Sequence, residues 1–364
     1  MKKIAAFLCS TVMLMSVSFA EFDTEKIDLF RQMIQDRYYQ DISDEELMEG
    51  AIRGMFNSLD RYSAYYDKEE SETFEETVSG QYVGIGIKME NLNNYTHIVK
   101  VFNNSPAANA GLASQDYIIK INGEDIAGWH INKVATYIRG EAGTEVKLTI
   151  LRGSETFDVT LKRASVQVQS CELGIFDENI GYIKIEEFNA DTYNEFNNYY
   201  HALNIIGIEK LIIDLRDNPG GYVSQCVMIG NLIVPRGNIT VLKYKNEEEE
   251  MAYRSFCDDV KIKKIIVLVN ENTASASEIL AGAMQDTGSG IIVGTQTYGK
   301  GVVQEVYNLI GGGSVKITTA EYVTPNGRHI DGIGITPDFI VEEQQGGDAQ
   351  LNKAIELLSS GNIT

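Results

Sequence analysis

The stretch that decides the fold runs from Glu271 to Gln304 and reads ENTASASEILAGAMQDTGSGIIVGTQTYGKGVVQ. The block before it, IIVLV at 265–269, is short and β-branched, which predicts a buried strand. Small residues follow at 273–277, and the apolar run ILAGAM at 279–284 predicts a helix. A strand, a tight turn and a helix place one hydroxyl at a helix N-terminus. There, free N–H groups and the helix dipole favour a developing negative charge.

Further along the same stretch, Lys300 stands between two glycines, with strand-like residues at 291–293 and 302–303 on either side. A lysine between glycines at a strand edge meets no bulky neighbour, and an amine that burial keeps neutral can take the proton of a serine hydroxyl. The plainer interpretation is that the Ser-Ala repeat caps a helix and that Gly-Lys-Gly forms a turn. The fragments taken separately leave both interpretations open.

Taken together, TASASEILAGAMQD and GKGVVQ resemble the carboxyl-terminal processing (tail-specific) proteases, a family of Ser-Lys peptidases. The resemblance implies that Ser275 is the nucleophile, that Lys300 is the general base, and that Gln304 assists the lysine. Thr273 stands where the family most often has a serine, and Ser277 is the competing serine of the turn.

The spacing of the last two residues raises a geometric question. In a straight strand the Cα atoms of Lys300 and Gln304 would lie about 13 Å apart, at roughly 3.3 Å per residue. Contact between the two side chains therefore requires a bend, which we expect at Gly301.

A second glycine-containing turn, RDNPGG at 216–221, follows the strand-like residues 211–215. Glycines after a strand allow backbone N–H groups to approach a ligand closely. The resemblance implies that Gly220 or Gly221, together with Ala276, forms an oxyanion hole. From the residues alone, the segment is simply a type I or II turn.

The residues from about Gly80 to Arg163 resemble a PDZ domain. The resemblance implies that the segment QYVGIGI binds the terminal carboxylate of a peptide, which then pairs along a strand edge. The expected peptide-binding residues are Tyr82, Val83, Gly84, Ile85 and Gly86. A module that only packs against its neighbours is the alternative.

A helix at 131–138 is expected to wall the peptide groove and to end at Arg139. We expect Arg139 to couple an occupied groove to the protease core. The alternative is a solvated arginine at a helix end.

Before this region, the residues from Asp23 to about Tyr66 predict helices, and SDEE at 43–46 is typical of a capping box. The segment LDRYSAY at 59–65 is similar to the family's Leu-Asp-Pro-Tyr-Ser motif, with Arg61 in place of the proline. In the family such an N-terminal element often mediates self-association. A cap on the core without a partner is the alternative.

The first 20 residues predict a signal peptide, with Lys2 and Lys3 before an apolar segment and a small-x-small cleavage site at 18–20. An uncleaved membrane anchor is the alternative. The protein is therefore expected to be exported, in the periplasm or elsewhere outside the cytoplasm. Cys9 lies within this segment, and the other three cysteines have neither a disulfide pattern nor metal-ligand spacing.

Composition limits the choice of partners. The chain has 364 residues and a formal net charge of −21, which argues against a nucleic-acid partner. The four histidines show no metal-ligand spacing, and neither a Gly-x-Ser-x-Gly elbow nor a phosphate-binding loop is present. We expect no cofactor and no metal.

The sequence thus predicts an α/β protease core, a mixed sheet with helices of the crotonase and ClpP type, with an inserted PDZ domain and an N-terminal helical segment. The predicted divisions are the signal peptide 1–20, the helical segment 21–78, the PDZ domain 80–163 and the protease core 164–364. The predicted function is a serine endopeptidase that cleaves exported proteins with free C-termini. A homo-oligomer through the N-terminal helices and an adaptor protein are further expectations. A non-catalytic scaffold or chaperone that only binds tails is the alternative function.

Overall fold

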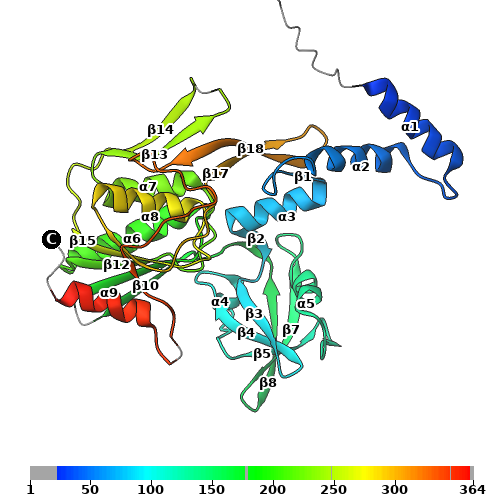
Figure 1. The fold of residues 1–364 in the computed structure, drawn as a ribbon. Coiled ribbons are helices and arrows are strands. Elements are labelled where there is room, and N and C mark those ends of the chain that lie inside the picture. Colours follow the sequence, from blue (N-terminus) through cyan, green and yellow to red (C-terminus); the bar gives the residue numbers. More distant parts are fainter. Residues whose placement is uncertain (1–22, 177–178, 247, 345, 361–364) are drawn as a thin grey trace, which may run out of the picture. The chain divides into compact units, whose positions relative to one another are not determined.

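The computed structural model describes residues 23–176, 179–246, 248–344 and 346–360 (Figure 1). The predicted signal peptide at 1–20 lies outside the described residues. The chain forms two compact units, one up to Leu59 and one from Asp60 onward.

The first unit contains two helices, α1 (Thr24–Arg37) and α2 (Asp44–Phe56). The predicted capping box is confirmed, because Ser43 Oγ accepts a bond from the N–H of Glu46 and the Glu46 carboxylate accepts one from the N–H of Ser43. Neither helix has a fully buried side chain.

The second unit begins with a strand rather than a helix. β1 (Ala64–Tyr66) pairs antiparallel with β18 (Ser314–Val323), so the prediction of helix through Tyr66 is wrong for these three residues. Aromatic residues favour a strand where a partner edge is available, and the Tyr66 ring also stacks on Phe74 at 4.8 Å. Phe74 belongs to α3 (Lys68–Ser79), which ends at a left-handed Gly80.

A smaller β-rich segment is inserted between two short paired strands, β2 (Gln81–Gly84) and β9 (Ala164–Gln167). Its sheet has the strand order β3-β4-β5-β7-β8, with β6 beside β5. The segment has its own core of buried aliphatic side chains. Its elements are β3 (Ile87–Leu92), β4 (Tyr95–Val101), α4 (Pro106–Asn109), β5 (Tyr117–Ile121), β6 (Glu124–Asp125), α5 (Ile131–Ile138), β7 (Glu145–Arg152) and β8 (Glu155–Lys162).

The rest of the unit is built on a six-stranded sheet of order β10-β11-β12-β15-β16-β19, in which only β10 and β11 are antiparallel. Its strands are β10 (Cys171–Phe176), β11 (Ile180–Ile185), β12 (Lys210–Asp214), β15 (Lys264–Val269), β16 (Ile291–Gly294) and β19 (Phe339–Ile340). The sheet confirms the predicted strands around the Ser-Ala turn and the mixed α/β class.

Helices cover both faces of this sheet, so its central strands are apolar on both sides. On one face of the sheet, Ile213 belongs to a core with side chains of α6 (Thr192–Ile205), α7 (Val223–Ile233) and α8 (Ala276–Thr287). On the other face, Ile212 belongs to a core with side chains of α9 (Ala349–Ser359).

A second sheet of the core has the order β1-β18-β13-β14, and β17 pairs with β18 (Figure 1). Its remaining strands are β13 (Gly237–Tyr244), β14 (Glu250–Ser255) and β17 (Val302–Asn308). The β17–β18 hairpin follows Lys300 directly, so this sheet positions the lysine loop.

Candidate active site

Ser275 occupies the turn between β15 and α8 and has the left-handed φ of 57°. A non-glycine residue in this region is strained, and such strain gathers at functional sites. The turn is held from several sides, since Thr273 Oγ1 donates to the carbonyl of Leu215 (2.8 Å) and the N–H of Ala274 donates to the carbonyl of Asn218 (3.0 Å). The sequence motif therefore produces a rigid turn that presents one serine at the start of a helix.

The two serines of the turn have different surroundings. Ser277 is fully buried, and its hydroxyl donates to the carbonyl of Asn218 (3.2 Å). Ser275 is only partly buried. Ser275 is therefore the serine that a substrate can reach.

The Asn-Pro-Gly-Gly turn lies against the same site. A Cβ on Gly220 would be 2.8 Å from Ser275 Cβ and 3.0 Å from the nitrogen of Ala276, so the turn approaches both residues as closely as only glycine permits. The N–H of Gly220 is already donated to Asn218 Oδ1 (2.9 Å). Within the described residues, the N–H groups of Gly221 and Ala276 make no hydrogen bond to the protein. Of the two glycines that the sequence left open, Gly221 is the one with a free donor.

Glu278 joins the serine turn to the lysine loop, a role that the sequence analysis did not assign. Its side chain is fully buried, and its carboxylate accepts bonds from the N–H groups of Ser275 (2.9 Å), Gly299 (2.7 Å) and Lys300 (2.9 Å). The hydroxyl of Thr297 donates a fourth bond (2.6 Å). Burial raises the pKa of Glu278, and these four donors oppose the rise because they stabilise the ionised form. The position of this glutamate, three residues after the serine as in a capping box, was the available signal.

The Lys300 side chain is half-buried, and its Nζ lies 4.8 Å from the centre of the Tyr62 ring. Burial lowers the pKa of Lys300 below its ordinary value of 10.5, and the positive charge of Lys316 lowers it further. Asp60 opposes this shift. No hydrogen bond joins Lys300 Nζ to Ser275 Oγ, both of which lie in described parts of the chain. The lysine thus has the burial that a general base requires, but it is not bonded to the serine.

Gln304 does not contact Lys300 through a hydrogen bond in the described chain, because its amide donates to Thr318 Oγ1 (3.1 Å) across the β17–β18 ladder. The bend expected at Gly301 stays a prediction, and the strand has an irregularity further along. The ladder shifts register between Val303 and Gln304, whereas Gly301 precedes the strand.

The two glycines beside Lys300 serve a purpose other than the predicted one. A Cβ on Gly301 would be 2.2 Å from the nitrogen of Asp331, and one on Gly299 would be 3.0 Å from the nitrogen of Ile333. The glycines therefore allow the chain at 331–334 to pack directly against the lysine loop, rather than leaving open space around it.

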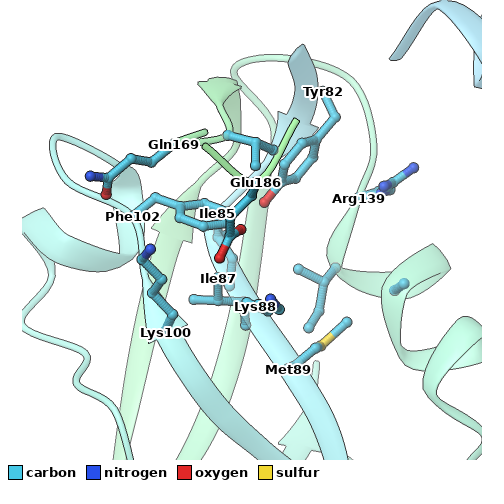
Figure 2. A pocket seen from close by; sticks show the side chains of 13 residues that line it. Tyr82, Ile85, Ile87, Lys88, Met89, Lys100, Phe102, Arg139, Gln169 and Glu186 are labelled. Carbon is cyan, nitrogen blue, oxygen red and sulfur yellow. The ribbon is translucent and has the colours of Figure 1, made fainter. Parts of the chain in front are cut away.

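A pocket lies between β3 and α5 of the inserted segment, and residues 168, 169 and 186 from outside that segment also line it (Figure 2). Of the predicted peptide-binding residues, Tyr82, Ile85 and Arg139 line the pocket, whereas Val83, Gly84 and Gly86 do not. The other lining residues are mainly apolar, with two lysines, Gln169 and Glu186 among them: Ile87, Lys88, Met89, Lys100, Phe102, Ala135, Ile138, Val168, Gln169 and Glu186.

Arg139 bridges this pocket and α3. Its Nη1 donates to Glu76 Oε2 (2.9 Å), and its guanidinium lies 5.0 Å from the centre of the Tyr82 ring. The side chain is 48% exposed, so the ion pair is screened by water.

Neither metal sites nor membrane-spanning helices occur in the part of the chain that the structure describes. Among the cysteines, Cys171 and Cys226 are buried and Cys257 is partly buried.

Comparison with known proteins identifies three regions of the chain. Residues 179–341 match the peptidase family S41 model, residues 97–152 a PDZ domain, and residues 12–70 the N-terminal domain of the activating protease CtpB. The carboxy-terminal processing protease CtpA of Bacillus subtilis is 36% identical over 330 residues, which cover 90% of this chain and 71% of the relative. A probable CtpA-like serine protease of Staphylococcus saprophyticus is also 36% identical, covering 88% of this chain and 66% of the relative. The chain spans about two thirds of the length of these two curated relatives.

Solved structures share the fold. The photosystem II D1 C-terminal processing protease superposes with a TM-score of 0.53 at 24% identity, covering 92% of this chain and 91% of that one. An S41 protease from Bacteroides fragilis gives a TM-score of 0.56 at 17% identity, covering 89% and 91%.

The fold is thus that of the serine peptidases that carry a PDZ domain. Within that class, the chain belongs to peptidase family S41, with the CtpA-type carboxy-terminal processing proteases.

Proposed function

We propose that the protein is a serine endopeptidase that captures the free C-terminal tails of exported proteins and cleaves them with a Ser-Lys dyad. The observation that carries the proposal is the buried carboxylate of Glu278, which accepts the N–H groups of both Ser275 and Lys300. Two residues 25 positions apart are thereby held at one site, one of them a strained serine and the other a lysine with a lowered pKa.

In the proposed reaction, Ser275 Oγ attacks a peptide carbonyl carbon while its proton passes to neutral Lys300. Lys300 must first move to within hydrogen-bonding distance of the serine. The N–H groups of Ala276 and Gly221 stabilise the oxyanion. Lys300 then protonates the leaving amine, and the acyl-enzyme is hydrolysed by a water that Lys300 deprotonates. Gln304 orients the lysine after its side-chain amide has left Thr318 and formed a hydrogen bond with the lysine amine.

The pocket of the PDZ domain receives the tail in this proposal. Its mainly apolar lining suits an apolar terminal side chain, and we assign capture of the carboxylate to the loop at 82–86. Arg139 couples the pocket to the core through Glu76 on α3.

The domain divisions and cellular setting are part of the proposal. We assign 1–20 to a signal peptide, 21–78 to an N-terminal segment, 80–163 to the PDZ domain and 164–364 to the protease core. Export follows from the signal-like sequence, and the exposed apolar side chains of α1 and α2 support self-association. We also propose that an adaptor protein delivers substrates to the enzyme.

The experiment is an incubation with an unstructured protein that ends in apolar residues, followed by mass spectrometry of the products. We expect discrete fragments with wild type and an intact substrate with Ser275→Ala. A tail-binding scaffold would instead bind the substrate and leave it uncut in both cases.

A further inference from the structure

Tyr322 lies behind the proposed dyad, and no step of the proposed reaction uses it. It is the second-to-last residue of β18, and only 1% of its surface is exposed. Its N–H donates to the carbonyl of Gly301 (2.9 Å), immediately after the lysine. The backbone of β18 is thus already tied to the lysine loop.

The Tyr322 hydroxyl reaches two backbone carbonyls. Its single hydrogen is shared between the carbonyl of Ser275 (3.1 Å) and the carbonyl of Lys300, as a three-centre hydrogen bond. One phenol therefore bridges the backbone of the proposed nucleophile to that of the proposed base.

This bridge complements the one that Glu278 makes. The glutamate accepts the N–H groups of Ser275 and Lys300, and the tyrosine binds their carbonyls. Each residue of the dyad is consequently held through both of its own backbone polar groups. The Ser275 carbonyl also accepts the N–H of Ile279 (3.0 Å), whereas the Lys300 carbonyl has no second donor within the described residues. Loss of the phenol would therefore leave the Lys300 carbonyl unpaired, which is costly in a low-dielectric interior.

The hydroxyl is a permanent donor. Burial raises the pKa of Tyr322 well above its ordinary value of 10.0, and the negative charge of Glu278 raises it further. The phenol therefore stays protonated wherever the enzyme is folded and does not act as a base.

We propose that Tyr322 is a positioning residue that fixes the separation of Ser275 and Lys300 through their backbones. This inference rests on the proposed Ser-Lys chemistry. In this role, Tyr322 acts on the dyad without touching the substrate.

The test compares Tyr322→Phe with wild type, with Tyr200→Phe as the matched control. Tyr200 is also a buried tyrosine of the core, and its hydroxyl accepts a backbone N–H, from Ile262, away from the site. For Tyr322→Phe we expect kcat to fall by about 10- to 100-fold with KM unchanged, because small displacements of reacting groups cost rates of this order. Tyr200→Phe should lower the melting temperature by a similar amount and keep the wild-type kcat.

A pH profile separates positioning from simple loss of stability. A loosened lysine loop admits water to Lys300, so its pKa moves back toward 10.5 and the acidic limb of the rate profile moves to higher pH. Replacing Tyr322 by 4-aminophenylalanine keeps a donor at the same place and should restore most of the rate, which also provides a test if the phenylalanine variant does not fold.

The inference is overturned if Tyr322→Phe retains the wild-type kcat, if it loses activity without any shift of the acidic limb, or if the amino analogue fails to restore the rate. Failure of the proposed function is a different result, since wild type itself would then cut no substrate.

Discussion

Ser275 and Ser277 differ at the scale of a single residue, and the difference assigns the proposed nucleophile. Ser277 is buried and bonded to the carbonyl of Asn218, whereas Ser275 is partly accessible and has a strained backbone. We expect Ser275→Ala to abolish cleavage, a loss of at least about 10⁴-fold for a nucleophile, with the fold and tail binding intact. Ser277→Ala should lower the melting temperature and leave most of the activity. Peptide cleavage and thermal unfolding of both variants measure this, and the reverse pattern of activity would assign the chemistry to Ser277.

The protonation state of Lys300 should set how the activity depends on pH. A general base must be neutral, and burial lowers the pKa of Lys300, so activity should rise with pH through that lowered pKa rather than near 10.5. The unfolded lysine binds its proton more tightly than the folded one. Between the folded and the unfolded pKa, the unfolded state therefore holds more protons, and the free energy of unfolding rises with pH.

Lys300→Arg provides the sharpest variant, because a guanidinium keeps its proton at every accessible pH. We expect it to be as inactive as Lys300→Ala from about pH 5 to pH 10. Rates on one peptide across this range measure the effect, and appreciable activity of the arginine variant would exclude lysine as the base.

At the scale of elements, the Asn-Pro-Gly-Gly turn packs closely against the start of α8. Gly220 has a φ of 102°, and a Cβ there would meet Ser275 Cβ at 2.8 Å. We expect Gly220→Ala to lower kcat by about 10²- to 10³-fold, because the turn that supplies the oxyanion donor moves away from the serine. Gly311→Ala is the matched control, with a φ of 98° and open space around the added methyl group.

Both glycine variants carry the strain of a left-handed alanine, about 1–2 kcal/mol. Gly220→Ala adds the close contact with Ser275, so its melting temperature should fall further than that of Gly311→Ala, and only Gly220→Ala should lose catalysis. Equal kcat values for the two variants would show that the turn does not support the oxyanion hole.

Elements were predicted well where their signals are local. The helix at 131–138 and the helix that starts after Ser275 have the predicted positions, because periodicity and small residues mark them directly. The contacts of Lys300 and Gln304 could not be predicted in this way. Tyr62 lies near Lys300 because β1 pairs with β18, about 250 residues further along the chain, and no local pattern encodes that pairing. Thr318 meets Gln304 across the β17–β18 hairpin, whose register the sequence does not reveal.

The same limit applies to Ala64–Tyr66. A segment of three residues that follows two helices gives no periodic signal of its own, and its strand exists because β18 offers an edge. Glu278 was visible in the sequence as a residue of a helix start. Its four donors come from the loop at 297–300 and from Ser275, so its role appears only in the folded chain.

At the scale of the whole molecule, we propose that the pocket binds a C-terminal tail while the core cleaves the same chain. The PDZ domain is connected to the core through the paired strands β2 and β9 and through the ion pair of Arg139 with Glu76. A peptide held by its end in the pocket would leave its upstream residues free to enter the site at Ser275. The C-terminal carboxylate should therefore decide which chains are cleaved.

The most direct measurement compares cleavage of one apolar-ended peptide in two forms, with a free C-terminal carboxylate and with an amidated C-terminus. Binding of both forms to Ser275→Ala by fluorescence anisotropy supplies the matched affinity, without cleavage. We expect the wild-type enzyme to cut the free form at least about tenfold faster, and the inactive variant to bind it more tightly, because a charge-assisted hydrogen bond to the carboxylate is worth about 1.5–3 kcal/mol. Equal rates and equal affinities for the two forms would contradict the claim that the protein is a protease directed by C-terminal tails.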